Sequence, residues 1–91
     1  MNGVNADPKN IRDFQRQLNQ FNRELEMISR KLKNNLRTLN EGWKDSEFRK
    51  FELQMNDVLR AIDHHMQQSN DYVRYLDKKA EPLERYLGRG G

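Results

Sequence analysis

Two adjacent histidines, His64 and His65, are the residues of this chain best suited to acid–base or metal chemistry. Neighbouring side chains on a helix point about 100° apart, whereas one metal ion needs ligands on a shared face, such as residues four apart. Asp57 and Asp71 lie one heptad from His64 on its own face, too far away to share an ion with it. The sequence also has no glycine-rich phosphate loop, nucleophile motif or zinc-ligand spacing. We therefore expect no enzyme activity, no catalytic residue, no metal and no cofactor, and a function based on binding.

A stripe of basic residues is the second pattern that could bind a ligand. Its members recur every seven residues and so share one helix face: Lys9, Arg16, Arg23, Arg30, Arg37 and Lys44. Aligned cations attract phosphates or an acidic partner, but the same residue types also form good helices with a solvated outer face. Nearby aromatic residues that could stack on bases are missing, which favours the solvated face. A basic nucleic-acid-associated protein that uses this stripe remains the alternative function.

The chain divides into two helical segments near position 42. Residues 40–46 hold its densest cluster of residues that end or begin helices, and Asp7 followed by Pro8 is typical of a helix start. Pro82 should stop or kink the second helix. We predict an all-α fold, an antiparallel two-helix hairpin over 8–81, with a helix at 8–40, a bend at 41–45 and a helix at 46–81. Residues 1–7 are predicted to be disordered, and 82–91 to form a short turn and a flexible tail.

A heptad pattern predicts which face of the first helix is buried. One core series holds Ile11, Leu18, Leu25, Leu32 and Leu39, and the other holds Phe14, Phe21 and Ile28. Asn35 takes the next place in the second series, and Leu36 beside it indicates that the seam drifts toward Trp43. Either a polar residue fixes the register there, or the helix rotates slightly as its geometry departs from a seven-residue repeat, which we favour.

The second helix carries a broader apolar face. Its seam starts at Phe48 and Phe51, and a parallel series runs one place to the side: Leu59, Met66, Val73, Ala80 and Leu87. This surplus indicates either dimer packing or a face that wraps a crooked first helix. We favour a dimer, and predict that the hairpin pairs into a four-helix bundle.

The low hydrophobic content of the chain also indicates that it needs a partner chain to complete its core. The 91 residues are 34% hydrophobic and 34% charged, without cysteine, which is lean for a domain that must build its own core. We expect a homodimer, or a heterodimer with a similar helical protein. No apolar run follows Met1 and none reaches membrane length, so we expect no cleavable signal peptide and no membrane partner. The protein is expected to be cytoplasmic when made, and secretion without a cleavable signal stays open.

The bend contains the only tryptophan of the chain, Trp43. A large ring at this place can plug the open end of the seam between Leu39 and Phe48, or it can serve as a docking point for a partner. We predict that the bend site consists of Gly42, Trp43, Asp45, Phe48 and Phe51.

The stretch Trp43-Lys-Asp-Ser-Glu-Phe-Arg-Lys-Phe51 resembles the Trp-Xaa-Gly family of small helical-hairpin proteins, the ESAT-like substrates and partners of specialised bacterial secretion systems. Phe51 matches an apolar residue that the family often has about eight places after the tryptophan. Asp45 stands where the family has glycine, and Tyr72 is followed by Leu76 where the family's export signal has an acid. The resemblance implies a secreted substrate, adaptor or chaperone that acts through helix–helix pairing, with a secreted effector or a component of the secretion machinery as partner.

Overall fold

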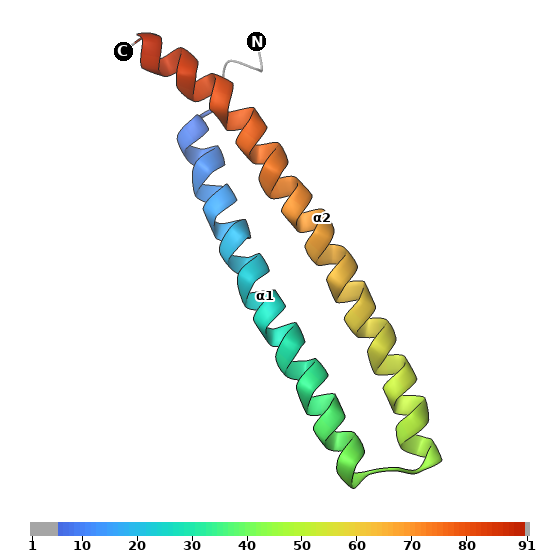
Figure 1. The fold of residues 1–91 in the computed structure, drawn as a ribbon. Coiled ribbons are helices and arrows are strands. Elements are labelled where there is room, and N and C mark those ends of the chain that lie inside the picture. Colours follow the sequence, from blue (N-terminus) through green and yellow to red (C-terminus); the bar gives the residue numbers. More distant parts are fainter. Residues whose placement is uncertain (1–5, 91) are drawn as a thin grey trace.

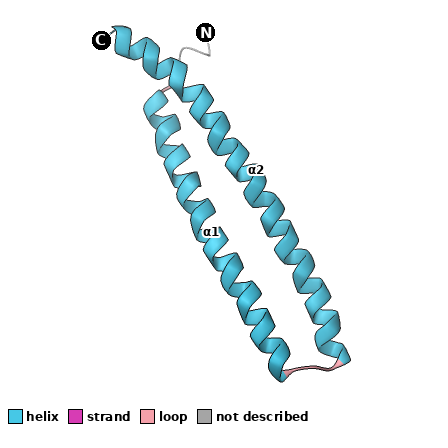
Figure 2. Cartoon of the chain, viewed as in Figure 1, coloured by secondary structure: helices cyan, strands magenta, loops and turns pink. Residues whose placement is uncertain are grey.

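The protein is a helical hairpin in the computed structural model, which describes residues 6–90, with side chains over 6–88. Helix α1 spans Pro8–Gly42 and helix α2 spans Ser46–Gly90. The two run antiparallel in a body of 67 × 20 × 13 Å (Figure 1). Figure 2 shows the short loop that joins them. The predicted all-helical hairpin is thus confirmed. Of the residues predicted to be disordered, 1–7, residues 1–5 lie outside the described part of the chain, and residues 6–7 precede α1 without helical structure.

Each helix begins directly after an aspartate. Asp7 precedes Pro8, and its Oδ1 accepts a hydrogen bond of 2.9 Å from the backbone N–H of Lys9. Asp45 Oδ1 accepts one of 3.0 Å from the backbone N–H of Phe48. Each carboxylate satisfies an N–H that the first turn of a helix leaves without a partner. The two caps therefore fix where α1 and α2 start, and with them the three-residue link between the helices.

The prediction that the second helix stops at residue 81 is wrong. Helix α2 continues through Pro82 to Gly90, and its last turns lean over beyond the start of α1 (Figure 1). Proline has no N–H to donate to the carbonyl of Lys78 and its ring presses on that carbonyl, which bends a helix without necessarily ending it. Because Pro82 is exposed, water can solvate the freed carbonyl. The first helix also runs two residues further than predicted, to Gly42.

Helix α1 faces α2 with a different stripe from the predicted one. The residues turned toward α2 include a series that recurs every seven positions, here called the inner series: Pro8, Gln15, Asn22, Ser29, Leu36 and Trp43. Asn22 and Ser29 are 5% and 2% exposed. The predicted second core series is instead exposed, with Phe14 at 56%, Phe21 at 55% and Ile28 at 53%.

The bend explains this rotation. Leu36 of the inner series packs with Phe48 and Leu59 of α2, and Trp43 and Met55 lie against this cluster. A three-residue link leaves α1 little freedom to turn about its axis once that end is packed. The sideways drift predicted near Leu36 therefore extends along the whole helix. As a result, a largely polar stripe is buried and an apolar stripe is left outside.

Candidate interaction surface

An apolar face spans both helices of the hairpin. We define it by its exposed or half-exposed members: Phe14, Phe21, Ile28, Leu32 and Leu39 of α1, and Val58 and Tyr72 of α2. The α1 members flank the seam on one side, because they follow the same heptad places as the predicted core. Val58 and Tyr72 flank it on α2 in the same way. In an antiparallel pair these flanks lie on the same side of the hairpin.

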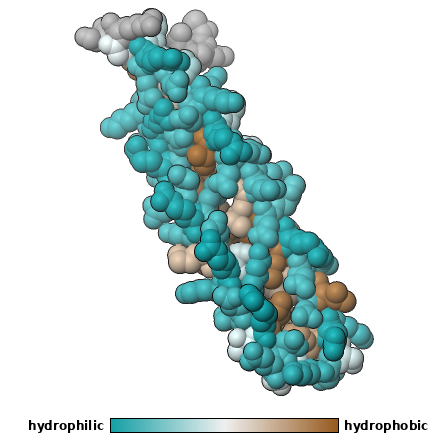
Figure 3. All heavy atoms as spheres, viewed as in Figure 1, coloured by the Kyte–Doolittle hydropathy of each residue, from teal (hydrophilic) through white to brown (hydrophobic). Residues whose placement is uncertain are grey.

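A shallow groove lies between the two helices beside the α1 half of the apolar face. It is lined by Leu32, Asn35, Leu36 and Leu39 from α1 and by Phe51 and Met55 from α2. Figure 3 shows one side of the molecule, where hydrophobic residues emerge along the line between the helices and gather toward the bend. Asn35 is the one polar residue that lines this groove. The groove can therefore take an apolar side chain from another chain.

The predicted bend site divides into a packed part and an exposed part. The Trp43 ring lies edge-on to Phe48 with centroids 5.3 Å apart, and it stacks on Phe51 at 6.1 Å. Phe48 is fully buried, whereas Trp43 and Phe51 are half-buried. Gly42 is exposed with open space around it, and Asp45 caps α2. This geometry supports Trp43 as a plug for the seam, and its remaining exposure leaves an edge available to a partner.

The series predicted to face a second chain lies largely inside the hairpin. Leu59 is 3% exposed and Ala80 is fully buried, so neither can be covered by another protein. Met66 and Val73 are half-buried, and Leu87 is 55% exposed near the end of α2. The prediction is wrong for Leu59 and Ala80, because these side chains pack against α1 of the same chain. The exposed apolar surplus lies instead on the stripe of α1 that carries Phe14, Phe21 and Ile28.

The basic stripe is exposed along α1, as its spacing predicts, but part of its charge is neutralised. Arg16 pairs with Asp13, and Arg30 pairs with Glu26, both on the same helix. Arg37 donates a hydrogen bond of 2.6 Å to Asn34 Oδ1. Lys9, Arg23 and Lys44 form no ion pair with any residue that the structure describes. Because ion pairs within α1 neutralise part of the charge, the geometry favours the interpretation of the basic stripe as a solvated outer face.

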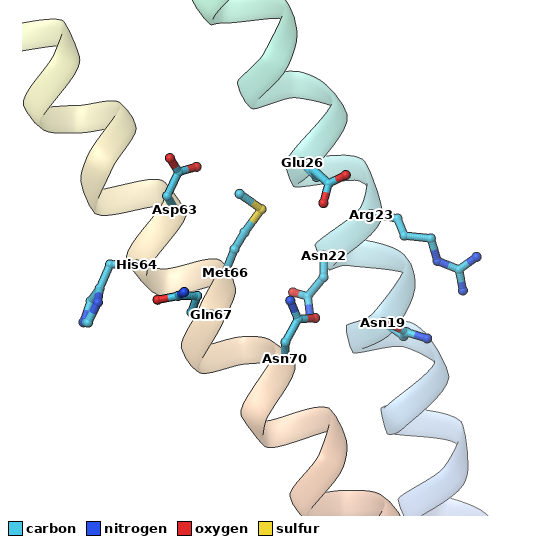
Figure 4. Close-up of a pocket in the computed structure, with 9 residues that line it drawn as sticks. All are labelled: Asn19, Asn22, Arg23, Glu26, Asp63, His64, Met66, Gln67 and Asn70. Atoms are coloured by element: carbon cyan, nitrogen blue, oxygen red, sulfur yellow. The ribbon is translucent and has the colours of Figure 1, made fainter.

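A polar groove lies on the side of the seam that carries Asn19 and Gln67. Inside it, Asn22 Nδ2 donates a hydrogen bond of 3.1 Å to Asn70 Oδ1. Figure 4 shows these two amides reaching toward each other, while His64 and Arg23 point away on opposite sides. The His64 and His65 rings are tilted with centroids 6.1 Å apart. No group of three potential metal ligands occurs among the described residues.

The open end of the hairpin is held by one arginine that the sequence analysis did not single out. Arg12 Nη1 donates to Asp77 Oδ1 at 2.6 Å, and its Nη2 and Nε donate to the two oxygens of Glu84 at 2.7 and 2.9 Å. These hydrogen bonds lower the pKa of Asp77 and of Glu84 below their ordinary values, and they raise the pKa of Arg12. Arg12 could have been predicted from two features: it lies beside the inner series, and its partners Asp77 and Glu84 are spaced seven residues apart on the opposite helix.

The total exposed area is large for a chain of this length. The hairpin exposes 7512 Å². A compact monomer of the same mass exposes about 5,600 Å² by the usual scaling of area with mass, so the hairpin exposes about a third more. None of the described helices combines the length and apolarity that crossing a membrane requires.

Comparison with known proteins adds no relative. No family model matches the chain, and neither the curated proteins nor the solved structures give a match.

Proposed function

We propose that this protein is a non-enzymatic interaction module that works by pairing its apolar face with another helical chain. The observation that carries this proposal is the position of Phe14, Phe21 and Ile28, which are more than half exposed in a chain otherwise rich in charge. An exposed apolar surface that crosses two helices is typical of a protein–protein contact. The four-helix bundle predicted from the sequence is the arrangement in which two hairpins cover such faces.

The setting that we propose for this module is a specialised bacterial secretion system, as a secreted substrate, adaptor or chaperone. Two features support it. The bend sequence around Trp43 resembles that of ESAT-like hairpin proteins, and the hairpin itself has the shape that this resemblance implies. The half-buried Trp43 beside Phe51 gives the bend an aromatic edge that a partner can contact.

A matched pair of variants tests the proposal. Ile28→Glu places a charge on the apolar face, whereas Met27→Glu makes the same change one residue earlier, where the side chain is similarly exposed at 57% but points away from that face. Association of the chain with itself, or with a helical protein encoded beside it, is measured by sedimentation velocity. We expect Ile28→Glu to abolish association and Met27→Glu to preserve it, with unchanged helicity for both. Equal behaviour of the two variants, or no association of the unmodified chain, contradicts the proposal.

Salt separates this function from nucleic-acid binding by the basic stripe. Binding to phosphates weakens steeply with rising salt because counterions are released, whereas apolar pairing does not. Replacing Arg23 with glutamine removes a stripe member without an ion pair among the described residues. We expect this variant to leave association unchanged at low and at high salt.

A further inference from the structure

We infer that the chain that covers the apolar face is a second copy of this protein, with its α1 lying antiparallel to the first α1 about a two-fold axis near Met27. This inference rests on the proposed function and names its partner. Three observations carry it: the amount of surplus surface, the order of apolar residues along α1, and the charges on the outer flank of the face.

The surplus area fits a two-chain interface. The exposed area of 7512 Å² exceeds that of a compact monomer by about 1,900 Å². Obligate homodimers bury about 2,000 to 5,000 Å² in total, or about 1,000 to 2,500 Å² per chain. A second hairpin laid face to face along the apolar face can therefore bring the exposed area per chain close to that of a compact protein.

The apolar residues of α1 are ordered so that they pair with themselves in reverse. In an antiparallel helix pair, each residue of one heptad core series packs opposite a residue of the other series. With the axis near Met27, Leu25 lies opposite the second copy's Ile28, Leu32 opposite its Phe21, and Leu39 opposite its Phe14. All of the exposed apolar members on α1 find an apolar partner in this register.

The outer flank of α1 is self-complementary in the same register. On α1, one flank of the apolar face is the inner series, whose Asn22 and Ser29 are buried against α2 and cannot contact a second chain. The other flank carries Gln17, Glu24, Lys31 and Thr38, all exposed. Glu24 and Lys31 form no ion pair with any described residue of their own chain. Antiparallel pairing about Met27 places each Glu24 beside the second copy's Lys31, and Gln17 beside its Thr38.

Helix α2 supports the same axis. Because Asn22 lies opposite Asn70, the antiparallel order places Met27 opposite His65. Val58 and Tyr72 lie one heptad on either side of His65 and are 50% and 57% exposed. The two-fold axis therefore places Val58 of one α2 opposite Tyr72 of the other. An interface on one stripe of this kind is closed by symmetry and stops at two chains.

Charge reversal tests this pairing directly. Glu24→Lys turns both contacts of the pair into Lys–Lys, and Lys31→Glu turns them into Glu–Glu. We expect each variant alone to self-associate about tenfold more weakly than the unmodified chain at low salt, equivalent to about 1.4 kcal/mol. An equal mixture of the two variants restores association, because every contact across the mixed dimer is then between opposite charges. The double variant restores it as well.

The controls use the same charge changes away from the face. The controls are Glu41→Lys and Lys78→Glu. Both residues are exposed and neither forms an ion pair with a described residue, so each substitution changes only the net charge. Their association should equal that of the unmodified chain, and circular dichroism should show equal helicity for all variants. Failure of the mixture to recover overturns the antiparallel pairing, as does normal association of either single variant. If Ile28→Glu still disrupts a complex in that case, the proposed function stands, and the complex either pairs two copies in another register or contains a different chain.

Discussion

The bend half of the hairpin and its open half are held together by different forces. At the bend, Leu36, Phe48 and Leu59 form an apolar cluster that Trp43 covers. At the open end, Arg12 bridges the helices to Asp77 and Glu84, and Gln15 Nε2 donates to the carbonyl of Val73 at 3.2 Å. Apolar burial contributes stability in proportion to area, whereas exposed ion pairs contribute little. Helix pairing is thus anchored at the bend and only aligned at the open end.

This difference has a consequence for binding. The polar residues Asn22, Ser29 and Asn70 between the helices fix their register but add little to the stability of the hairpin. The hydrogen bond between Asn22 and Asn70 contributes about 1 kcal/mol, and Ser29 Oγ has no partner among the described residues. The apolar residues that could strengthen the open half, Phe14 and Phe21, lie on the outside. We therefore expect the open half to gain most from a second chain.

The largest expected effect is the loss of the apolar anchor. Phe48→Ala removes the one large side chain that is fully buried among the described residues, and it should lower the free energy of unfolding by about 4 kcal/mol. Such a loss is most of the stability of a small domain. Thermal unfolding followed by circular dichroism measures it. A Phe48→Ala variant that melts like the unmodified chain contradicts the bend as the anchor.

Trp43→Ala should have a smaller effect, because the ring is only half-buried. We expect a loss of roughly 2 kcal/mol, with a blue-shifted fluorescence emission of Trp43 in the unmodified protein. Emission typical of fully hydrated indole, together with an unaltered melting curve, would indicate that Trp43 is a docking residue and not a plug.

Ser29→Ala should stabilise the hairpin. The hydroxyl is buried at 2% exposure and no described residue bonds to it, so its removal recovers a desolvation cost of about 1 kcal/mol. Thr38→Ala serves as the control on the same helix, since Thr38 is exposed and its hydroxyl donates to the carbonyl of Asn34 at 3.2 Å. Alanine is also the better helix former at both positions, so denaturant unfolding should show a higher midpoint for both variants and the larger rise for Ser29→Ala. A lower midpoint means that water satisfies Ser29.

Arg12→Gln should have the smallest global effect, confined to the open end. Hydrogen exchange should speed up near residues 8–20 and 73–88 and stay unchanged near the bend. The pKa values of Asp77 and Glu84 are lowered in the folded state, so their contribution is present at neutral pH and is lost as the pH falls below their ordinary values of 3.8 and 4.5. The difference between the variant and the unmodified chain should therefore vanish in acid. A difference that persists there excludes these two carboxylates as its cause.

The sequence was sufficient for the topology but not for the rotation of the helices. Asp7, Pro8, Asp45 and the seven-residue spacing predict the hairpin and the starts of its two helices. Heptad spacing predicts which residues share a face, but it does not distinguish the stripe that faces the helix of the same chain from the stripe that faces another chain. That choice depends on how the three-residue link and Leu36 pack against Phe48, which is a long-range property.

Pro82 shows a second limit of the sequence pattern. A proline costs one hydrogen bond and some strain, but near an exposed helix end the remaining bonds can outweigh this cost. The Arg12 bridge was missed for a related reason. Its partners lie 65 and 72 residues away, and only the observed register of α1 against α2 brings them together.

Oxidative footprinting at two protein concentrations tests most directly whether the apolar face is covered. Phe21 and Met27 are almost equally exposed in one hairpin, at 55% and 57%, but only Phe21 belongs to the apolar face. As the concentration rises into the range where the chain associates, we expect oxidation of Phe21 to fall several-fold and oxidation of Met27 to stay constant. Parallel behaviour of the two residues at every concentration would contradict pairing through this face.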